Sequence, residues 1–301
     1  MLKFEPISLK DKPWIDDIVF SEGSRSADFN FGNLYMWDGR YKQLVCRCGS
    51  RMITKIRYEG VPAFAFPIGS GDLSGPICAL KEFADHRGYP LVIYGIEEAN
   101  KALLEQLFPG RFRFTLQEST FDYLYLAEKL SSYAGKSLHG KKNHCNFFES
   151  SFPGWQFLPI DRSGIPRCMD MLSIWQEDNA ARLDSSIRYE HDAIIRAFAA
   201  YESLGLDGGM LIHDGKVLGF SIGERCCRDC FDVHFEKADI SIRGAYPMVC
   251  REMTRMISAK YPEVKYINRE DDLGLESLRA SKLSYKPEYL LQKYTARWTD
   301  D

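Results

Sequence analysis

The sequence predicts an α+β fold made of two units that share the same order of elements. Each half reads as helices, an antiparallel hairpin and then strand–helix–strand–helix–strand. A chain of 301 residues is also long enough for two domains of ordinary size. The halves share no obvious sequence identity, so the duplication is inferred from element order alone. The boundary falls near residues 127–155, and we assign residues 1–140 to the first unit and 141–301 to the second.

In the first half, segments with apolar residues at helical spacing alternate with strand-like runs bounded by glycine. The expected helices are a short one at 14–19, an aromatic-rich one at 29–37, and two more at 75–86 and 97–108. The expected strands are 42–48, 51–58, 62–67, 91–94, 111–116 and 121–126.

The second half has a comparable order, and the turn Asp214-Gly215 between two strand-like runs indicates its hairpin. The expected helices are 166–178, 190–203, 244–260 and 275–281. The expected strands are 210–213, 217–222, 232–235, 265–268 and 288–294.

Composition and charge bound the class of protein. A hydrophobic content of 45% and a charged content of 27% are typical of a soluble globular protein. The formal net charge of −3 gives no global reason to expect nucleic-acid or membrane-surface binding. No apolar run approaches the ~20 residues that span a bilayer. The N-terminus lacks the apolar core of a signal peptide, and nine cysteines then indicate reduced thiols in the cytoplasm.

Polar groups gather in the C-terminal part of the chain, where strands give way to helices. The four polar runs are 233–239, 243–247, 266–272 and 282–287. Strand ends and helix N-termini are the places where an α/β layer presents side chains and free amides to a ligand. The functional site is therefore expected here.

The strand at 232–235 ends in two candidate acid–base groups. By period-two alternation His234 and Glu236 share one face. A carboxylate in this place can accept a proton from an attacking amine if burial raises its pKa. The alternative is a salt bridge from Glu236 to Lys237, Arg243 or Arg269.

The turn into the helix at 244–260 is a candidate phosphate site. Gly244 lets a ligand approach the backbone, and Arg243 adds positive charge beside the positive end of the helix dipole. Pro247 is tolerated because its missing N–H lies in the first turn. An ordinary tight start to a helix explains the same residues.

A polar cluster covers residues 268–274. Asp271 or Asp272 can cap the following helix, whereas Asn268 and Arg269 precede the expected cap. The planar guanidinium of Arg269 is suited to bidentate binding of a carboxylate or phosphate.

Residues 129–148 form a basic segment with no acidic residue from 130 through 148. The segment can contact nucleic-acid phosphates or an anionic cofactor, or it can be the solvated face of an exposed helix. Cys46-x-Cys48 and Cys227-x-x-Cys230 lack the second pair or nearby histidines of a zinc site, so no metal is expected.

Five motifs together resemble one bacterial family. They are Asp122-Tyr123-Leu124-Tyr125; Gly135-Lys136-x-x-His139-x-Lys141-Lys142-Asn143-His144-x-Asn146-x-Phe148; His234-Phe235-Glu236-Lys237-Ala238; Asn268-Arg269-Glu270-x-Asp272-x-Gly274-x-x-x-Leu278-Arg279; and Lys282-Leu283-Ser284-Tyr285-x-Pro287. This family comprises proteins similar to the soluble catalytic domain of phosphatidylglycerol lysyltransferase, and the resemblance covers essentially the whole chain.

The resemblance implies two tandem GNAT-like acyltransferase units, as in Fem-type aminoacyltransferases, each a mixed, mostly antiparallel sheet flanked by helices. It implies transfer of an acyl or aminoacyl group from a thioester or aminoacyl-tRNA to an amine or hydroxyl. We expect Glu236 to be the base, main-chain amides of 232–239 to bind the oxyanion, and Tyr246 or Tyr285 to protonate the leaving group.

The remaining expected roles are binding roles. The residues expected to bind a donor cofactor are Arg243, Gly244 and Ala245. Those expected to bind substrate are His234, Asn268, Arg269, Glu270 and Lys282, with Lys136, Lys141 and Lys142 contacting a tRNA acceptor end if tRNA is the donor.

Donor and acceptor stay open at this point. GNAT enzymes usually carry Arg/Gln-x-x-Gly-x-Gly/Ala for the coenzyme A pyrophosphate, and alignment on Gly244 puts Ser241 and Tyr246 at the outer positions. The donor is thus acyl-coenzyme A or aminoacyl-tRNA, and the acceptor a small molecule, peptide or lipid headgroup. The lysyltransferases carry a membrane segment ahead of this domain, which these residues lack. The alternatives are a coenzyme A-dependent N-acetyltransferase on a small amine and a non-catalytic ligand-binding protein with the same fold.

Overall fold

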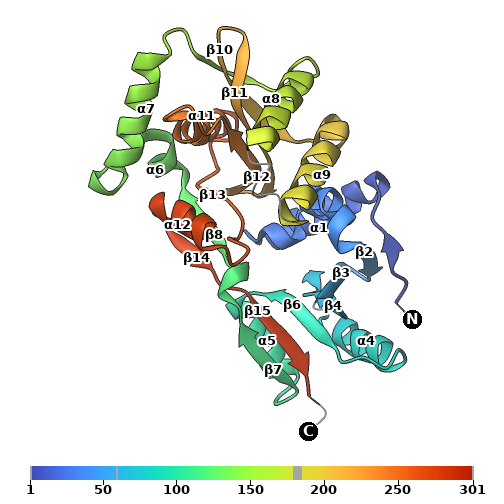
Figure 1. Ribbon diagram of the computed structural model, residues 1–301. Coiled ribbons are helices and arrows are strands. Elements are labelled where there is room, and N and C mark those ends of the chain that lie inside the picture. The colour runs from blue at the N-terminus through green and yellow to red at the C-terminus, as the bar shows by residue number, and fades with distance from the viewer. Residues whose placement is uncertain (1, 59, 179–184, 300–301) are drawn as a thin grey trace.

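The computed structural model describes residues 2–58, 60–178 and 185–299. These residues form two mixed sheets with helices packed against them, which confirms the predicted α+β fold of two GNAT-like units (Figure 1). Among the described helices, none combines the length and the apolar composition needed to cross a bilayer.

The first sheet has eight strands in the order β1-β2-β3-β4-β6-β15-β7, with β5 paired to β3. Its strands are β1 (Glu5–Pro6), β2 (Leu44–Cys48), β3 (Arg51–Tyr58), β4 (Val61–Ala65), β5 (Ile68–Gly69), β6 (Val92–Ile96), β7 (Phe112–Leu116) and β15 (Tyr294–Trp298). The pair β4–β6 is parallel, and the neighbouring pairs are antiparallel. The helices of this unit are α1 (Lys12–Glu22), α2 (Phe31–Met36), α3 (Asp38–Tyr41), α4 (Ser74–Asp85) and α5 (Glu98–Leu107).

The second sheet has seven strands in the order β14-β8-β13-β12-β11-β10-β9. They are β8 (Asp122–Leu126), β9 (Gln156–Pro159), β10 (Asp207–His213), β11 (Lys216–Cys227), β12 (Cys230–Ala238), β13 (Tyr266–Asn268) and β14 (Tyr289–Leu291). The pair β12–β13 is parallel, and the neighbouring pairs are antiparallel. The helices are α6 (Ala127–Ser132), α7 (His139–Ser151), α8 (Gly164–Asp178), α9 (Ser185–Ala199), α10 (Tyr201–Leu204), α11 (Ala245–Lys260) and α12 (Glu276–Ser284).

Helices α6, α7 and α11 cover one face of the second sheet, and α8 and α9 cover the other (Figure 1). The second of these faces shares a hydrophobic core with the first unit, in which Trp37 packs against Phe235 with ring centroids 6.0 Å apart. The two units are therefore joined by a common apolar interior.

The sheets do not divide at residue 140. Strand β8, which precedes that residue, lies in the second sheet between β14 and β13. Strand β15, close to the C-terminus, lies in the first sheet between β6 and β7 (Figure 1). The single strand expected at 288–294 was wrong, since β14 and β15 belong to different sheets. The helix expected at 190–203 likewise ends at Ala199, and α10 begins at Tyr201.

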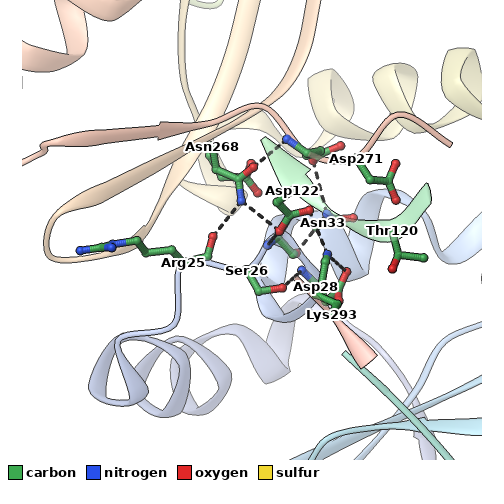
Figure 2. A network of polar contacts seen from close by, with 12 residues as sticks. Arg25, Ser26, Asp28, Asn33, Thr120, Asp122, Asn268, Asp271 and Lys293 are labelled. Carbon is green, nitrogen blue, oxygen red and sulfur yellow. Dashed lines mark hydrogen bonds and ion pairs between the residues drawn. The ribbon is translucent and has the colours of Figure 1, made fainter. Parts of the chain in front are cut away.

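A buried ionic centre joins the units where β8 passes between them. Asp122 accepts hydrogen bonds from the Ala27 N–H at 2.9 Å and the Asn268 amide at 3.1 Å (Figure 2). Its other oxygen contacts the ammonium of Lys293 at 2.9 Å, and Asp28 contacts the same ammonium at 2.9 Å. Burial disfavours the charged lysine, but the two carboxylates outweigh it and raise the pKa of Lys293. The Asp122 carboxylate thus contacts the first unit, β13 and the residue before β15 at the same time.

Replacing Lys293 by methionine is expected to lower the free energy of unfolding by about 3–5 kcal/mol, because the buried carboxylate of Asp122 and the half-buried one of Asp28 lose their counter-ion. Denaturant unfolding followed by circular dichroism measures this change. Arg162→Met is the control, since its ion pair with Glu202 is exposed and worth roughly 0–1 kcal/mol. Equal losses in the two variants would contradict the role assigned to Lys293.

Candidate functional site

Strand β12 contains a bulge at His234. Val233 is paired with Gly223 and Phe235 with Ile222, so His234 is an extra residue in the strand. The extra residue reverses the alternation of side chains along β12. Phe231, Val233 and Glu236 line a void beside α11, whereas Phe235 packs on the opposite face. The expectation that His234 and Glu236 share a face was therefore wrong.

Glu236 lies where β12 extends beyond its partner β13. The pairing of these parallel strands ends at Asp232 and Asn268, and Arg269 follows directly. The Arg269 guanidinium donates to the Glu236 carboxylate at 2.8 Å, and both side chains are largely buried. The alternative salt bridge is thus formed with Arg269, while Lys237 pairs with Glu190 at 2.8 Å.

The ion pair of Glu236 and Arg269 differs from a surface salt bridge in its burial. Burial raises the pKa of the Glu236 carboxyl, although Arg269, Lys141 and Lys282 oppose the shift. Nη1 of Arg269 is buried and has no hydrogen-bond partner among the described residues. One guanidinium nitrogen therefore remains able to donate to a ligand oxygen.

Tyr285 and two lysines complete the surroundings of Arg269. The Arg269 guanidinium lies 4.5 Å and the Lys141 ammonium 3.7 Å from the centre of the Tyr285 ring. Lys282 donates to the main-chain carbonyls of Arg269, Glu270 and Asp271, the second at 3.1 Å. Burial lowers the pKa of both Lys141 and Lys282. The structure thus brings together five of the residues expected from the sequence.

The space between these groups is small. Glu236 and Arg269 line a void of about 10 Å³, together with Cys250 and Thr254 of α11. Such a volume holds about one water molecule. An acyl group can reach Glu236 only if neighbouring side chains move.

The N-terminus of α11 is covered by α7. Gly244 has a φ of 93°, and a Cβ atom there would lie 2.4 Å from the His144 carbonyl oxygen. Gly244 and Ala245 are buried, while Arg243 is exposed with its guanidinium 4.5 Å from the centre of the Phe147 ring. In the loop before the helix, Asp239 accepts from the N–H and hydroxyl of Ser241 at 2.8 and 2.6 Å. The Asp239 carboxylate therefore already accepts from the Ser241 N–H, one of the main-chain donors of this loop.

The two candidate tyrosines differ in place. The Tyr246 hydroxyl accepts from the Trp175 indole at 3.1 Å, and burial raises its pKa to about 12. Tyr285 is fully buried beside Arg269, and burial raises its pKa well above the ordinary value. Lys136, just before α7, and Lys142, in the first turn of α7, are both exposed, unlike Glu236 and Arg269.

Three expected substrate-binding residues lie on the other side of β12. Asn268 donates to the Arg25 carbonyl at 2.7 Å, and its side-chain oxygen accepts the Glu270 N–H at 2.7 Å (Figure 2). His234 contacts Glu270 at 2.9 Å. These side chains face the junction between the units and not Glu236.

Sequence reasoning missed several residues of the two centres. Asp122 and Lys293 are charged residues next to apolar strands, which is visible in the sequence. That the two side chains form an ion pair is not, because they are far apart in the chain. Cys250 lies on the face of α11 toward Glu236, and nothing in its local sequence distinguishes it from a core thiol.

The fold is that of GNAT-like transferases of the acyl and aminoacyl class, and a buried ion pair of Glu236 and Arg269 lies in the second unit. The chain belongs to the family described as phosphatidylglycerol lysyltransferase, C-terminal, whose model matches residues 21–297.

Several solved structures share the fold. A conserved protein of unknown function from Bacteroides thetaiotaomicron is 35% identical, with a TM-score of 0.94 over 99% of this chain and 100% of that one. L-PGS from Bacillus licheniformis is 15% identical, with a TM-score of 0.68 over 99% and 93% of the two chains. FemX is 11% identical, with a TM-score of 0.64 over 97% and 96%.

A curated relative, an uncharacterised protein of Mycoplasmoides gallisepticum, is 26% identical over 187 residues. The match covers 60% of this chain and 58% of that relative's length.

Gly244→Ala is expected to lower the free energy of unfolding by about 1–3 kcal/mol, because a side chain is strained at this φ and collides with α7. Thermal or denaturant unfolding measures the change. Gly140→Ala is the matched control, since nothing lies within 4 Å of the place that its Cβ atom would take in α7. This control should gain up to about 1 kcal/mol. A neutral Gly244→Ala variant would contradict the close packing of α7 on α11.

Proposed function

We propose that the protein transfers an aminoacyl group from aminoacyl-tRNA to an amine or hydroxyl acceptor, with Glu236 as general base. The observation that carries the proposal is the buried pair of Glu236 and Arg269, set where β12 extends past β13. Burial raises the pKa of Glu236, which brings a carboxylate closer to the proton affinity that a base requires.

The chemistry assigned to the pair is acyl transfer. The acceptor nitrogen or oxygen attacks the ester carbonyl, and Glu236 takes the proton that the nucleophile loses. The carbonyl oxygen becomes an oxyanion, for which the free Nη1 of Arg269 is a suitable donor. The bond to the terminal ribose oxygen then breaks, and that oxygen leaves with a proton from Tyr246 or Tyr285.

The covered N-terminus of α11 supports tRNA over coenzyme A as donor. A coenzyme A pyrophosphate needs free main-chain amides and a favourable field at this turn. Here Gly244 and Ala245 are buried, α7 packs against the turn, and the Asp239 carboxylate sits in the loop. Each of these features disfavours an incoming pyrophosphate.

The exposed surface around α7 suits a nucleic-acid backbone. Lys136 and Lys142 are exposed there, Phe147 is 40% exposed, and Arg243 stacks on it. Positive groups beside an exposed aromatic ring match a strand of phosphates with an unpaired base. Relatives described as lysyltransferase, L-PGS and FemX support aminoacyl transfer as the reaction of this chain.

The class of acceptor is open, so the test offers each class of acceptor in a separate reaction. The full chain is incubated with labelled aminoacyl-tRNAs and, in turn, small amines, peptides with free amino groups, or phosphatidylglycerol vesicles. Wild type is expected to move label from one tRNA to one pool. Glu236→Gln should slow this transfer by about 10²–10⁴-fold, since the base is lost without a change of shape.

Glu202→Gln, an exposed change on α10, should keep the wild-type rate and serves as control. Transfer from acetyl-coenzyme A in place of aminoacyl-tRNA would favour the N-acetyltransferase alternative. A folded protein that transfers from no donor would favour the non-catalytic alternative.

The pH dependence of transfer follows from the state of Glu236. The base acts as a carboxylate, so the rate falls as the pH is lowered through the pKa of this group. Because burial raises that pKa, the acid limb should lie above the ordinary glutamate value of about 4.3. Single-turnover rates, corrected for spontaneous ester hydrolysis, measure the limb. An acid limb at or below the ordinary value would count against Glu236 as the base.

A further inference from the structure

A second buried cluster of ionisable groups lies on the face of β12 opposite Glu236. His234 is at its centre, with Nδ1 2.9 Å from Glu270 Oε1 and 3.6 Å from Asp232 Oδ2. Nε2 lies 3.0 Å from Glu224 Oε1. The side chains of His234 and Asp232 are fully buried, and that of Glu224 is 8% exposed. Three carboxylates therefore surround one buried imidazole, and of these Glu270 is the most exposed, at 20%.

The ligand atoms have the spacing of a coordination shell. His234 Nδ1, Asp232 Oδ2 and Glu270 Oε1 all lie within 4.8 Å of one another. Two ligands with bonds of about 2.1 Å are about 3.0 Å apart at an octahedral angle and about 3.4 Å apart at a tetrahedral one. The distances of 2.9 and 3.6 Å from Nδ1 fall close to these values.

Two buried oxygen atoms at the cluster have no hydrogen-bond partner among the described residues. One is Asp232 Oδ1, and the other is Asn30 Oδ1. Asn30 is 2% exposed, and its amide nitrogen donates to Asp232 Oδ2 at 2.7 Å, so its free oxygen belongs to the same site. Buried acceptors without donors are costly, and a bound cation is one way to satisfy them.

We propose that His234, Asp232 and Glu270 bind one divalent first-row cation, with the free oxygens of Asp232 and Asn30 completing its surroundings. Binding replaces the proton on Nδ1, while Nε2–H still donates to Glu224 and fixes the orientation of the ring. The mixture of one imidazole with carboxylate and amide oxygens suits Mn²⁺ or Zn²⁺.

The backbone holds Glu270 in an uncommon conformation that serves this geometry. Its φ is 56°, in the left-handed region that glutamate rarely adopts. The Glu270 N–H donates to Asn268, and its carbonyl accepts from the Tyr123 N–H at 3.2 Å and from Lys282 at 3.1 Å. Three contacts thus stabilise a strained residue beside the cluster.

A surface pocket borders the cluster at Glu224 and Asn30. The pocket has a volume of about 330 Å³ and lies between α1 and β11. Asp16, Asp17 and Asp207 line the same pocket, and so do Lys12, which pairs with Asp16, and Arg225. The cluster lies on the face of β12 away from Glu236, so cation binding there does not depend on the aminoacyl transfer proposed above.

The test is a titration of the metal-stripped full chain with Mn²⁺, followed by the electron paramagnetic resonance signal of the free ion. Mn²⁺ prefers oxygen and nitrogen ligands, so the nine cysteines contribute little. Wild type is expected to remove one equivalent of Mn²⁺ per chain and to unfold at a higher temperature when it is bound. Glu270→Gln and Asp232→Asn should each weaken binding at least tenfold.

Two further variants make the test decisive. Asp85→Asn removes an exposed carboxylate of α4 and should bind Mn²⁺ as wild type does. Glu224→Gln keeps all three ligands and acts through the ring, so a loss of roughly 10–100-fold supports the assignment. Circular dichroism of each metal-free variant establishes that it is folded. Wild type that binds no Mn²⁺ at millimolar metal, or folded variants that bind it equally well, would overturn the proposal.

Discussion

The extra residue at His234 in β12 places His234 and Glu236 on opposite faces of the second sheet. Without it, His234 and Glu236 would lie on one face and compete for the same partners. With it, Glu236 meets Arg269 beneath α11, and His234 meets Glu224 and Glu270 at the junction of the units. The two buried charge clusters therefore lie on opposite faces of the same sheet.

Each cluster draws on residues that follow β13. Arg269 turns toward α11 and Glu270 toward the junction, so neighbours in sequence serve opposite faces. Lys282 binds the carbonyls of both residues and fixes the turn between them. A shift of that turn would change both clusters together, which couples the geometry of the proposed base to that of the junction.

The sequence was sufficient for the elements with local signatures. The helix expected at 244–260 is α11 from Ala245, and the hairpin at Asp214-Gly215 joins β10 to β11. The pairing of Glu236 with Arg269 was foreseen as one of three salt bridges. The bulge was not foreseen, because period-two reasoning assumes an uninterrupted strand. The contact between Asp122 and Lys293 spans 171 residues, and no spacing rule reports contacts of that range.

Strands β8 and β15 each belong to the sheet of the other half of the chain, so the two units are not separate along the sequence. Strand β15 fills the space between β6 and β7, and β8 fills the space between β13 and β14, so each unit borrows an interior strand from the far side of the boundary. A fragment cut between the units would carry a sheet with a gap in its middle and an unpaired strand that belongs elsewhere. The two units are thus interlocked through β8 and β15, and each sheet is complete only when both halves of the chain are present.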